Sequence, residues 1–159
     1  MIKRVLLFLI VSMCFTVSGI SKGQKSEKII TYKILTEQIL NEKRLKEISM
    51  GGKTQGTGGP LIPLSDGSFV TRDTIYEAIQ PILQSGMSIC PVLIKGLKSD
   101  KTHIRSASIL ALHMITKSEL PYYPLIEPSA PINIEAYNRW EQFLFEEKGV
   151  ERSLPTLDQ

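Results

Sequence analysis

The chain has few of the residue types that build disulfides and metal centres. It contains two cysteines and two histidines in 159 residues. Cys14 lies in an apolar N-terminal segment that we expect to be removed, so Cys90 would be the single cysteine of the mature chain. A single thiol cannot form an intramolecular disulfide. Because Cys90 lies in an apolar run, we predict that it is buried as a small apolar side chain.

The two histidines are too far apart to share a metal ion. His103 and His113 fall ten residues apart in one predicted helix, which separates them by about 15 Å along the helix axis. Ser106 lies close to His103 on such a helix, but a helical serine lacks the strained turn and the oxyanion donors of hydrolases. We therefore predict no catalytic residues, no metal and no cofactor. A thiol enzyme that pairs Cys90 with a histidine is the alternative.

The chain also lacks an excess of charge of either sign. The formal net charge is +3, and Lys3 and Arg4 belong to the expected leader. Without these two, 17 of the 19 basic residues remain against 16 acidic ones. Nucleic-acid binding requires a basic face with several phosphate contacts, so this balance argues against a nucleic-acid partner.

One short motif imitates a phosphate-binding loop. Gly52-Lys53-Thr54 has the ending of such a loop, which also requires a glycine at the position of Glu47 and a preceding strand. The sequence supplies neither, and a carboxylate at that position would repel a phosphate. We interpret residues 51–59 as a flexible glycine-rich loop without a nucleotide.

The N-terminus has the pattern of a secretory signal peptide. A basic start is followed by an apolar stretch over residues 5–17 and by small residues at 18–21. We predict a signal peptide over residues 1–19, with cleavage after Gly19, and export to the periplasm or the medium. The apolar stretch is too short to span a membrane. Lipidation at Cys14 in a bacterial lipobox is the alternative, although Met13 departs from that motif.

The rest of the chain predicts an all-α fold: one compact helical domain over residues 20–150, with four to five helices and a mobile tail at 151–159. Residues 61–70 allow a short hairpin before N-cap residues at 71–73. Ser88, Asp100 and Asn133 are expected to cap later helices. The expected helices cover residues 27–49, 74–84, 89–97, 100–117 and 134–147. Ile134, Tyr137, Trp140 and Leu144 form the predicted buried face of the last helix.

Residues 91–115 resemble a HEAT repeat, a pair of packed helices. Pro91, Leu93 and Leu97 match its first helix, and Ile104, Arg105, Ala107, Ala111, Leu112 and Ile115 match its second. The family has an acidic residue two positions after the last leucine. In this chain that position is Ser99, and the acidic residue, Asp100, comes one position later. The resemblance covers about a sixth of the chain. It implies that flanking helices bury the repeat.

One stripe of the predicted helix 100–117 is expected to face outward. Ile104, Ala107, Ala111 and Ile115 form its apolar row, and Ile109 and Leu112 lie well away around the axis. The remaining stripe contains His103, Ser106, His113 and Lys117. In the resembling family the second helices line the concave binding side, so we interpret these four residues as a binding surface.

The predicted function is a non-enzymatic, extracytoplasmic protein-interaction module whose partner is another protein. Two alternatives stay open. The first is an immunity-type inhibitor that binds a toxin in the periplasm. The second is a hydrolase or thiol enzyme that uses Cys90 and a histidine. Loss of activity after Cys90→Ala would identify the second of these.

Overall fold

The computed structural model describes residues 30–51 and 59–148, which are mostly helical. The elements in chain order are α2 (Tyr32–Ile34), the π-helix η1 (Leu35–Ile39), α3 (Glu42–Met50), β1 (Leu61–Pro63), β2 (Phe69–Thr71), α4 (Arg72–Leu83), the 3₁₀-helix η2 (Gly86–Ile89), α5 (Cys90–Leu97), α6 (Thr102–Thr116) and α7 (Pro131–Lys148). The predicted signal peptide with Cys14, residues 52–58 of the predicted loop and the predicted tail lie outside the described residues. The all-α prediction is right for the helices and omits a two-stranded sheet.

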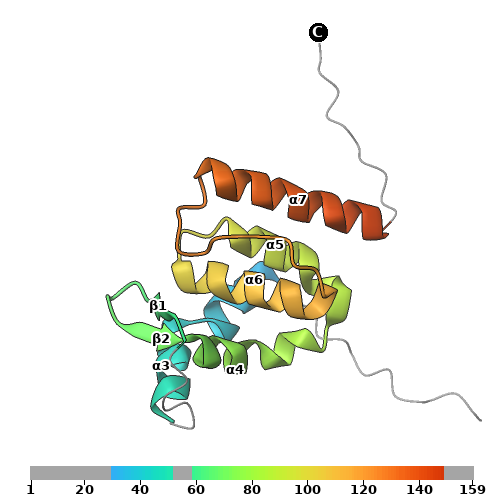
Figure 1. Cartoon of the computed structure of the whole chain (residues 1–159). Coiled ribbons are helices and arrows are strands. Elements are labelled where there is room, and N and C mark those ends of the chain that lie inside the picture. Colours follow the sequence, from blue (N-terminus) through green and yellow to red (C-terminus); the bar gives the residue numbers. More distant parts are fainter. Residues whose placement is uncertain (1–29, 52–58, 149–159) are drawn as a thin grey trace, which may run out of the picture.

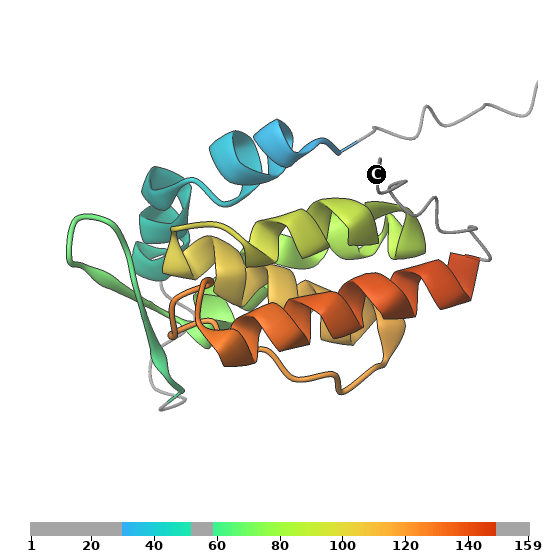
Figure 2. The same cartoon turned by 90° about the horizontal axis from the view of Figure 1, so that it is seen from above.

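Helix α6 lies in the middle of the fold, with α5 packed against it on one side and α4 on another. Helix α7 packs on α5, so α4, the α5–α6 pair and α7 follow one another as layers (Figure 1). The β1–β2 hairpin contacts both α6 and α4 at one end of these layers. Segments α2 and η1 lie beside α5, on the side opposite to α7 (Figure 2).

The predicted interior row of α6 is confirmed. Ala107 and Ala111 are fully buried, Ile104 is 3% exposed and Ile115 is half-buried. Every residue from His103 to Ile109 is buried, because neighbouring elements cover the first turns of α6 from several sides. The prediction that this helix is covered on most sides is therefore also confirmed.

Helices α5 and α6 approach each other closely at Gly96. A Cβ atom at this position would lie 2.1 Å from Ser108 Oγ and 3.1 Å from Ser108 Cβ. Both residues are buried. The hydrogen side chain of Gly96 therefore permits the close packing of the pair, since any larger residue would overlap Ser108.

The predicted single helix over residues 27–49 is wrong. The described chain forms α2 and η1, leaves the helix at Leu40 and Asn41, and starts again as α3. Asn41 has extended backbone angles (φ −70°, ψ 145°), and its Oδ1 accepts a hydrogen bond from the Arg44 amide at 2.9 Å. An asparagine in this conformation caps a new helix.

Residues 61–71 form the short hairpin that the sequence allows. Strands β1 and β2 are antiparallel, with Ile62 opposite Val70 and Pro63 opposite Phe69. Ile62 and Val70 are both buried, whereas Phe69 on the other face is exposed. Gly67 in the turn has a φ of 81°, a left-handed conformation that favours glycine.

The predicted cap at residues 71–73 is confirmed, whereas the predicted caps Ser88 and Asp100 are wrong. Thr71 caps α4, since its Oγ1 accepts a hydrogen bond from the Thr74 amide at 3.3 Å. Ser88 does not cap α5, because its hydroxyl donates to the Ser85 carbonyl at 2.6 Å. Helix α5 begins after Ile89 with a proline in its first turn, where the missing N–H needs no partner. Asp100 does not cap α6, which begins after Lys101 without a side-chain cap.

Asn133 is not the N-cap of α7, because the helix begins two residues earlier, at Pro131. The buried face of α7 consists of Asn133, Ala136, Trp140 and Leu144. Trp140 is fully buried, as predicted. Ile134 is 49% exposed, so its assignment to the buried face is wrong. The true face is rotated because an amide side chain, which the apolar pattern leaves out, occupies its first position.

Candidate functional site

A cavity of about 540 Å³ opens between the middle of the fold and its irregular segments. Helix α6 forms its floor, and the start of α4, the β1–β2 hairpin and the connection between α6 and α7 form its walls. The wall residues are Pro60, Ile62, Arg72, Ile75, Ser106, Ile109, Leu110, His113 and residues 122–126. A hollow of this size with mostly apolar walls is typical of a site that takes a small ligand or a few side chains of a partner.

One wall of the cavity is an irregular segment that Asn133 holds in place. The Asn133 side chain is fully buried. Its Nδ2 donates to the carbonyl oxygens of Tyr123, Ile126 and Glu127 at 3.0 to 3.1 Å, and its Oδ1 accepts from the Tyr123 amide at 3.1 Å. The amide of one side chain thus supplies hydrogen bonds to four backbone groups, which are not paired in a helix or a strand. This wall therefore has a defined shape.

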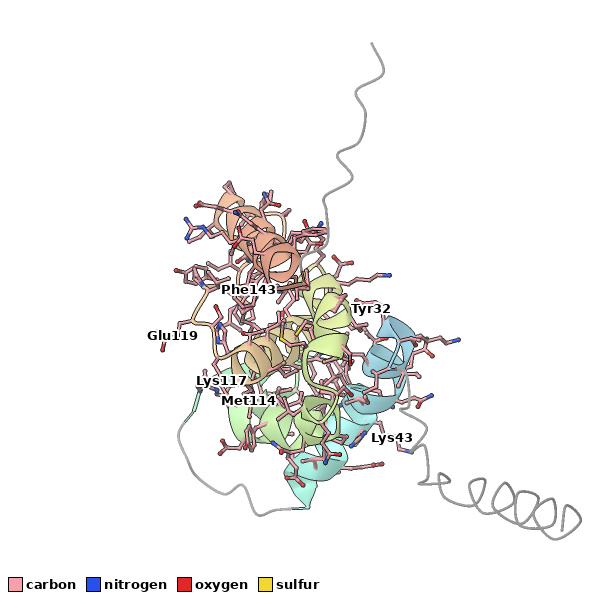
Figure 3. The ribbon with its side chains drawn as sticks, turned by 90° about the vertical axis from the view of Figure 1, so that its right-hand side faces the viewer. Tyr32, Lys43, Met114, Lys117, Glu119 and Phe143 are labelled. Carbon is pink, nitrogen blue, oxygen red and sulfur yellow. The ribbon has the colours of Figure 1, made fainter. Side chains whose placement is uncertain are left out.

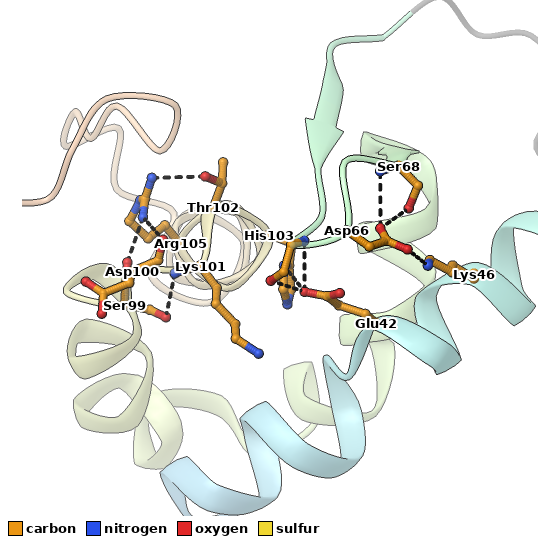
Figure 4. Close-up of polar contacts among 11 residues, drawn as sticks. Glu42, Lys46, Asp66, Ser68, Ser99, Asp100, Lys101, Thr102, His103 and Arg105 are labelled. Atoms are coloured by element: carbon orange, nitrogen blue, oxygen red, sulfur yellow. Dashed lines mark hydrogen bonds and ion pairs between the residues drawn. The ribbon is translucent and has the colours of Figure 1, made fainter.

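Arg105 ties the same segment to α6. Its guanidinium is buried, and Nε donates to the Pro124 carbonyl at 2.9 Å. The other nitrogens donate to the carbonyls of Ser99 and Asp100 and to the Thr102 hydroxyl (Figure 4). Four acceptors thus surround this buried cation, as a buried charge requires. Arg105 is consequently part of the frame and is not available to a ligand.

Tyr122 is a second anchor of the connection. Its hydroxyl donates to the Leu97 carbonyl at the end of α5. Burial raises the pKa of Tyr122, against a smaller opposing effect of the nearby Arg105 charge. The phenol therefore keeps its proton and serves as a hydrogen-bond donor.

The mouth of the cavity is apolar and exposed. Leu125 is 61% exposed, Tyr123 43% and Ile126 42%. These three wall residues lie in one short segment and expose apolar side chains to solvent. The hydrogen bonds of Asn133 and Arg105 hold the backbone of this segment in place. Exposed apolar side chains that cluster on such a frame are typical of an interaction site.

Besides the two tyrosines, three wall residues bring polar side chains to the cavity. Arg72, the first residue of α4, is exposed and has no hydrogen bond or ion pair among the described residues. Ser106 Oγ is buried and has no hydrogen-bond partner among them. The Nε2 atom of His113 lies 2.8 Å from the Leu120 carbonyl, which can only accept, so this nitrogen donates.

The predicted stripe on α6 is not one continuous surface. His103 is 1% exposed and Ser106 7% exposed, so the prediction that these two face solvent is wrong. The α3 and hairpin segments cover His103. Ser106 and His113 instead belong to the wall of the cavity. Lys117 is exposed at the end of α6, near Met114 and Glu119 (Figure 3), and does not line the cavity.

The buried His103 belongs to a polar cluster that joins α6 to the hairpin turn (Figure 4). Its Nδ1 lies 3.7 Å from Glu42 Oε1. The same oxygen accepts hydrogen bonds from the Ser65 amide at 3.1 Å and the Ser65 hydroxyl at 2.5 Å. Beside this group, Lys46 pairs with Asp66 in the turn. The cluster fixes the hairpin, and hence one wall of the cavity, relative to α3.

The His103 contacts predict that the fold loses stability in mild acid. Burial lowers the pKa of His103 most, Lys101 and Arg105 lower it further, and Glu42 and the Leu40 backbone raise it only in part. The unfolded chain therefore binds the proton more readily than the fold, so the free energy of unfolding decreases as the pH falls below about 6.5, the ordinary histidine pKa. We expect a lower denaturation midpoint at pH 5.5 than at pH 7.5, and a smaller difference in His103→Gln. An equal decrease in this variant would contradict the assignment.

The described residues hold no cluster of three or more histidine, cysteine or carboxylate side chains suited to a metal ion. Cys90 is fully buried, as predicted, and its Sγ lies 3.9 Å from Met87 Sδ. Burial in apolar surroundings makes a thiol unreactive. This position gives no support to the thiol-enzyme alternative.

A second, smaller groove of about 410 Å³ runs between α5 and α7. Lys95 and Glu141 contribute opposite charges to its walls. Tyr137 in this groove donates its hydroxyl to Glu141 at 2.5 Å, and burial together with that carboxylate raises the pKa of Tyr137. Tyr137 and Glu141 therefore satisfy each other within the fold.

Sequence reasoning found two of the cavity residues, Ser106 and His113, and missed the others. The hairpin, the first turn of α4 and residues 122–126 are remote from α6 in sequence, so no spacing rule joins them. One signal was present: Leu125-Ile126 places two large apolar side chains in a proline-rich connection. A connection of this kind is usually polar, so the pair indicates either burial or an interaction surface.

Among the described residues, no helix is both long and apolar enough to cross a bilayer. Comparisons with protein-family models, with curated proteins and with solved structures find no match to this chain.

Proposed function

We propose that this chain is a non-enzymatic binding module that docks an apolar segment of another protein in the cavity beside α6. One observation carries the proposal. The exposed side chains of Tyr123, Leu125 and Ile126 are displayed at the cavity mouth on a backbone that buried hydrogen bonds hold in place. A preformed apolar site loses little conformational entropy on binding, which favours association.

The HEAT-like interpretation of residues 91–115 and the secretory interpretation of residues 1–19 belong to this proposal. Helices α5 and α6 would be the two helices of the repeat, and the small residues Gly96, Ala107 and Ala111 at buried positions support close helix packing. The module would then act outside the cytoplasm. The mass of the protein recovered there would be that of residues 20–159. An intact N-terminus would contradict this part.

The partner class is what separates the remaining alternatives. An immunity-type inhibitor is a binding module whose partner is a toxin, so it would use the same kind of site. An enzyme would need an accessible nucleophile, and the described structure buries both Cys90 and Ser106. Binding without chemistry is the function that these side chains support best.

We expect Leu125→Asp to weaken partner binding by roughly tenfold or more, the size of effect expected at a central interface position. The side chain is 61% exposed, so the substitution should leave the denaturation midpoint nearly unchanged. The partner would be isolated with the wild-type protein from the cell's extracytoplasmic fraction, identified by mass spectrometry and titrated by calorimetry.

Met50→Asp is the matched control, because Met50 is 78% exposed and does not line the cavity. It should bind like the wild type. If Leu125→Asp bound the partner as tightly as Met50→Asp does, the cavity would not be the docking site.

A further inference from the structure

We infer that the segment docked in the cavity carries a carboxylate next to its apolar side chains, and that this carboxylate pairs with Arg72. The inference rests on the proposed function and adds the chemical nature of the partner segment. Among the described wall residues, Arg72 is the position at which a full charge meets the apolar surface.

Arg72 differs from the other arginines of the described residues in having no polar partner. Arg139 pairs with Glu135, Arg44 donates to the Gln38 carbonyl, and Arg105 has the four acceptors given above. Arg72 has none of these interactions, although it is a wall residue. Its guanidinium is therefore available to a ligand that enters the cavity.

None of the described residues that line the cavity is acidic, so none of them competes for this cation. Asp73 follows Arg72 in the chain, but it is not among the wall residues. The other wall residues are apolar except for Ser106, His113 and the two tyrosines. An occupant whose body is apolar and whose one charged group is negative would complement this arrangement.

A carboxylate fits this arrangement better than a phosphate. One guanidinium matches a carboxylate in a forked, two-bond geometry. A phosphate group carries a larger charge and three acceptor oxygens, so it requires more donors than this wall provides. The Ser106 hydroxyl is buried and out of reach of a ligand. Among the described wall residues, the exposed Tyr123 therefore supplies the additional donor, its hydroxyl. An apolar protein segment with an aspartate, a glutamate or its own C-terminus meets these requirements.

The test uses two synthetic peptides that differ by one charge: acetyl-Leu-Phe-Leu-Asp-amide and the same peptide with asparagine at the last position. Both are titrated into the purified chain, and dissociation constants are measured from NMR chemical shifts. We expect the aspartate peptide to bind about two- to fivefold more tightly, the size of an exposed ion pair, and 0.5 M salt to reduce this preference.

Arg72→Gln should abolish the preference and keep the affinity for the asparagine peptide. Arg139→Gln is the matched control, because it removes an exposed arginine of α7 that does not line the cavity, and it should keep the preference.

Equal binding of both peptides to the wild type, or a preference that survives in Arg72→Gln, would overturn the inference. If either of these results were found and Leu125→Asp weakened the binding of both peptides equally, the proposed function would stand and only the pairing with Arg72 would be wrong. Absence of binding by either peptide at millimolar concentration would contradict both.

Discussion

Replacing Ala111 with aspartate is expected to unfold the protein at 25 °C. Ala111 is fully buried in α6, between α5 and α4. The buried cation of the same helix, Arg105, already has four acceptors. The new carboxylate would have no partner, and burial of an unpaired charge costs several kcal/mol. This is a large part of the total stability of a typical domain, about 5–15 kcal/mol. Far-UV circular dichroism and thermal denaturation would detect the loss.

Asn138→Asp is the control for the charge alone. Asn138 is exposed on α7, so the same carboxylate remains hydrated there and should change the stability by less than about 0.5 kcal/mol. A denaturation midpoint of Ala111→Asp close to that of the wild type would show that α6 is not enclosed at this position. The layered arrangement around α6 would then be wrong.

Trp140→Ala is expected to reduce the free energy of unfolding by about 3–5 kcal/mol. Trp140 is fully buried on α7. Its ring centroid lies 5.7 Å from that of His113 and 5.9 Å from that of Phe143, the second contact being edge-to-face. Truncation would leave a cavity between α7 and α6. Urea denaturation followed by far-UV circular dichroism would measure the difference, since this signal does not depend on the tryptophan.

Trp140→Phe separates the loss of volume from the loss of the indole N–H. The Nε1 atom is buried and has no hydrogen-bond partner among the described residues, so its removal should cost little. We expect Trp140→Phe to be clearly more stable than Trp140→Ala. In the wild type the Trp140 emission should be blue-shifted, because the indole lies away from water. A water-like emission maximum in the folded protein would contradict its placement.

The sequence predicts the middle of the fold well, because helical periodicity and composition agree there. In α6 the small residues Ala107 and Ala111 recur at a helical step between larger apolar residues, and both are fully buried. The same reasoning predicts the burial of Cys90 and Trp140. These predictions depend on local properties, namely side-chain size, polarity and spacing along one helix.

The wrong predictions for Asn133 and His103 concern polar side chains that are buried inside the fold. Asn41 and Asn133 have the same cap chemistry in the sequence. Asn41 caps α3, whereas Asn133 binds the connection that walls the cavity. The sequence predicts His103 on a solvent-facing stripe, whereas the residue is buried beside Glu42. A polar residue does not reveal which backbone groups will lie within its reach, because those groups come from other parts of the chain.

The amino-acid sequence is sufficient to predict that the described chain is mainly helical and which row of α6 is buried, because these properties follow from the spacing of apolar residues within a single element. The folded arrangement is needed to see that the hairpin, the start of α4, α6 and residues 122–126 enclose one cavity. It is also needed to see that the Arg72 side chain stands in its wall with no hydrogen bond or ion pair to another described residue. These features depend on segments that are far apart along the chain. The segments meet through packing and buried hydrogen bonds, and no periodicity in the sequence connects them.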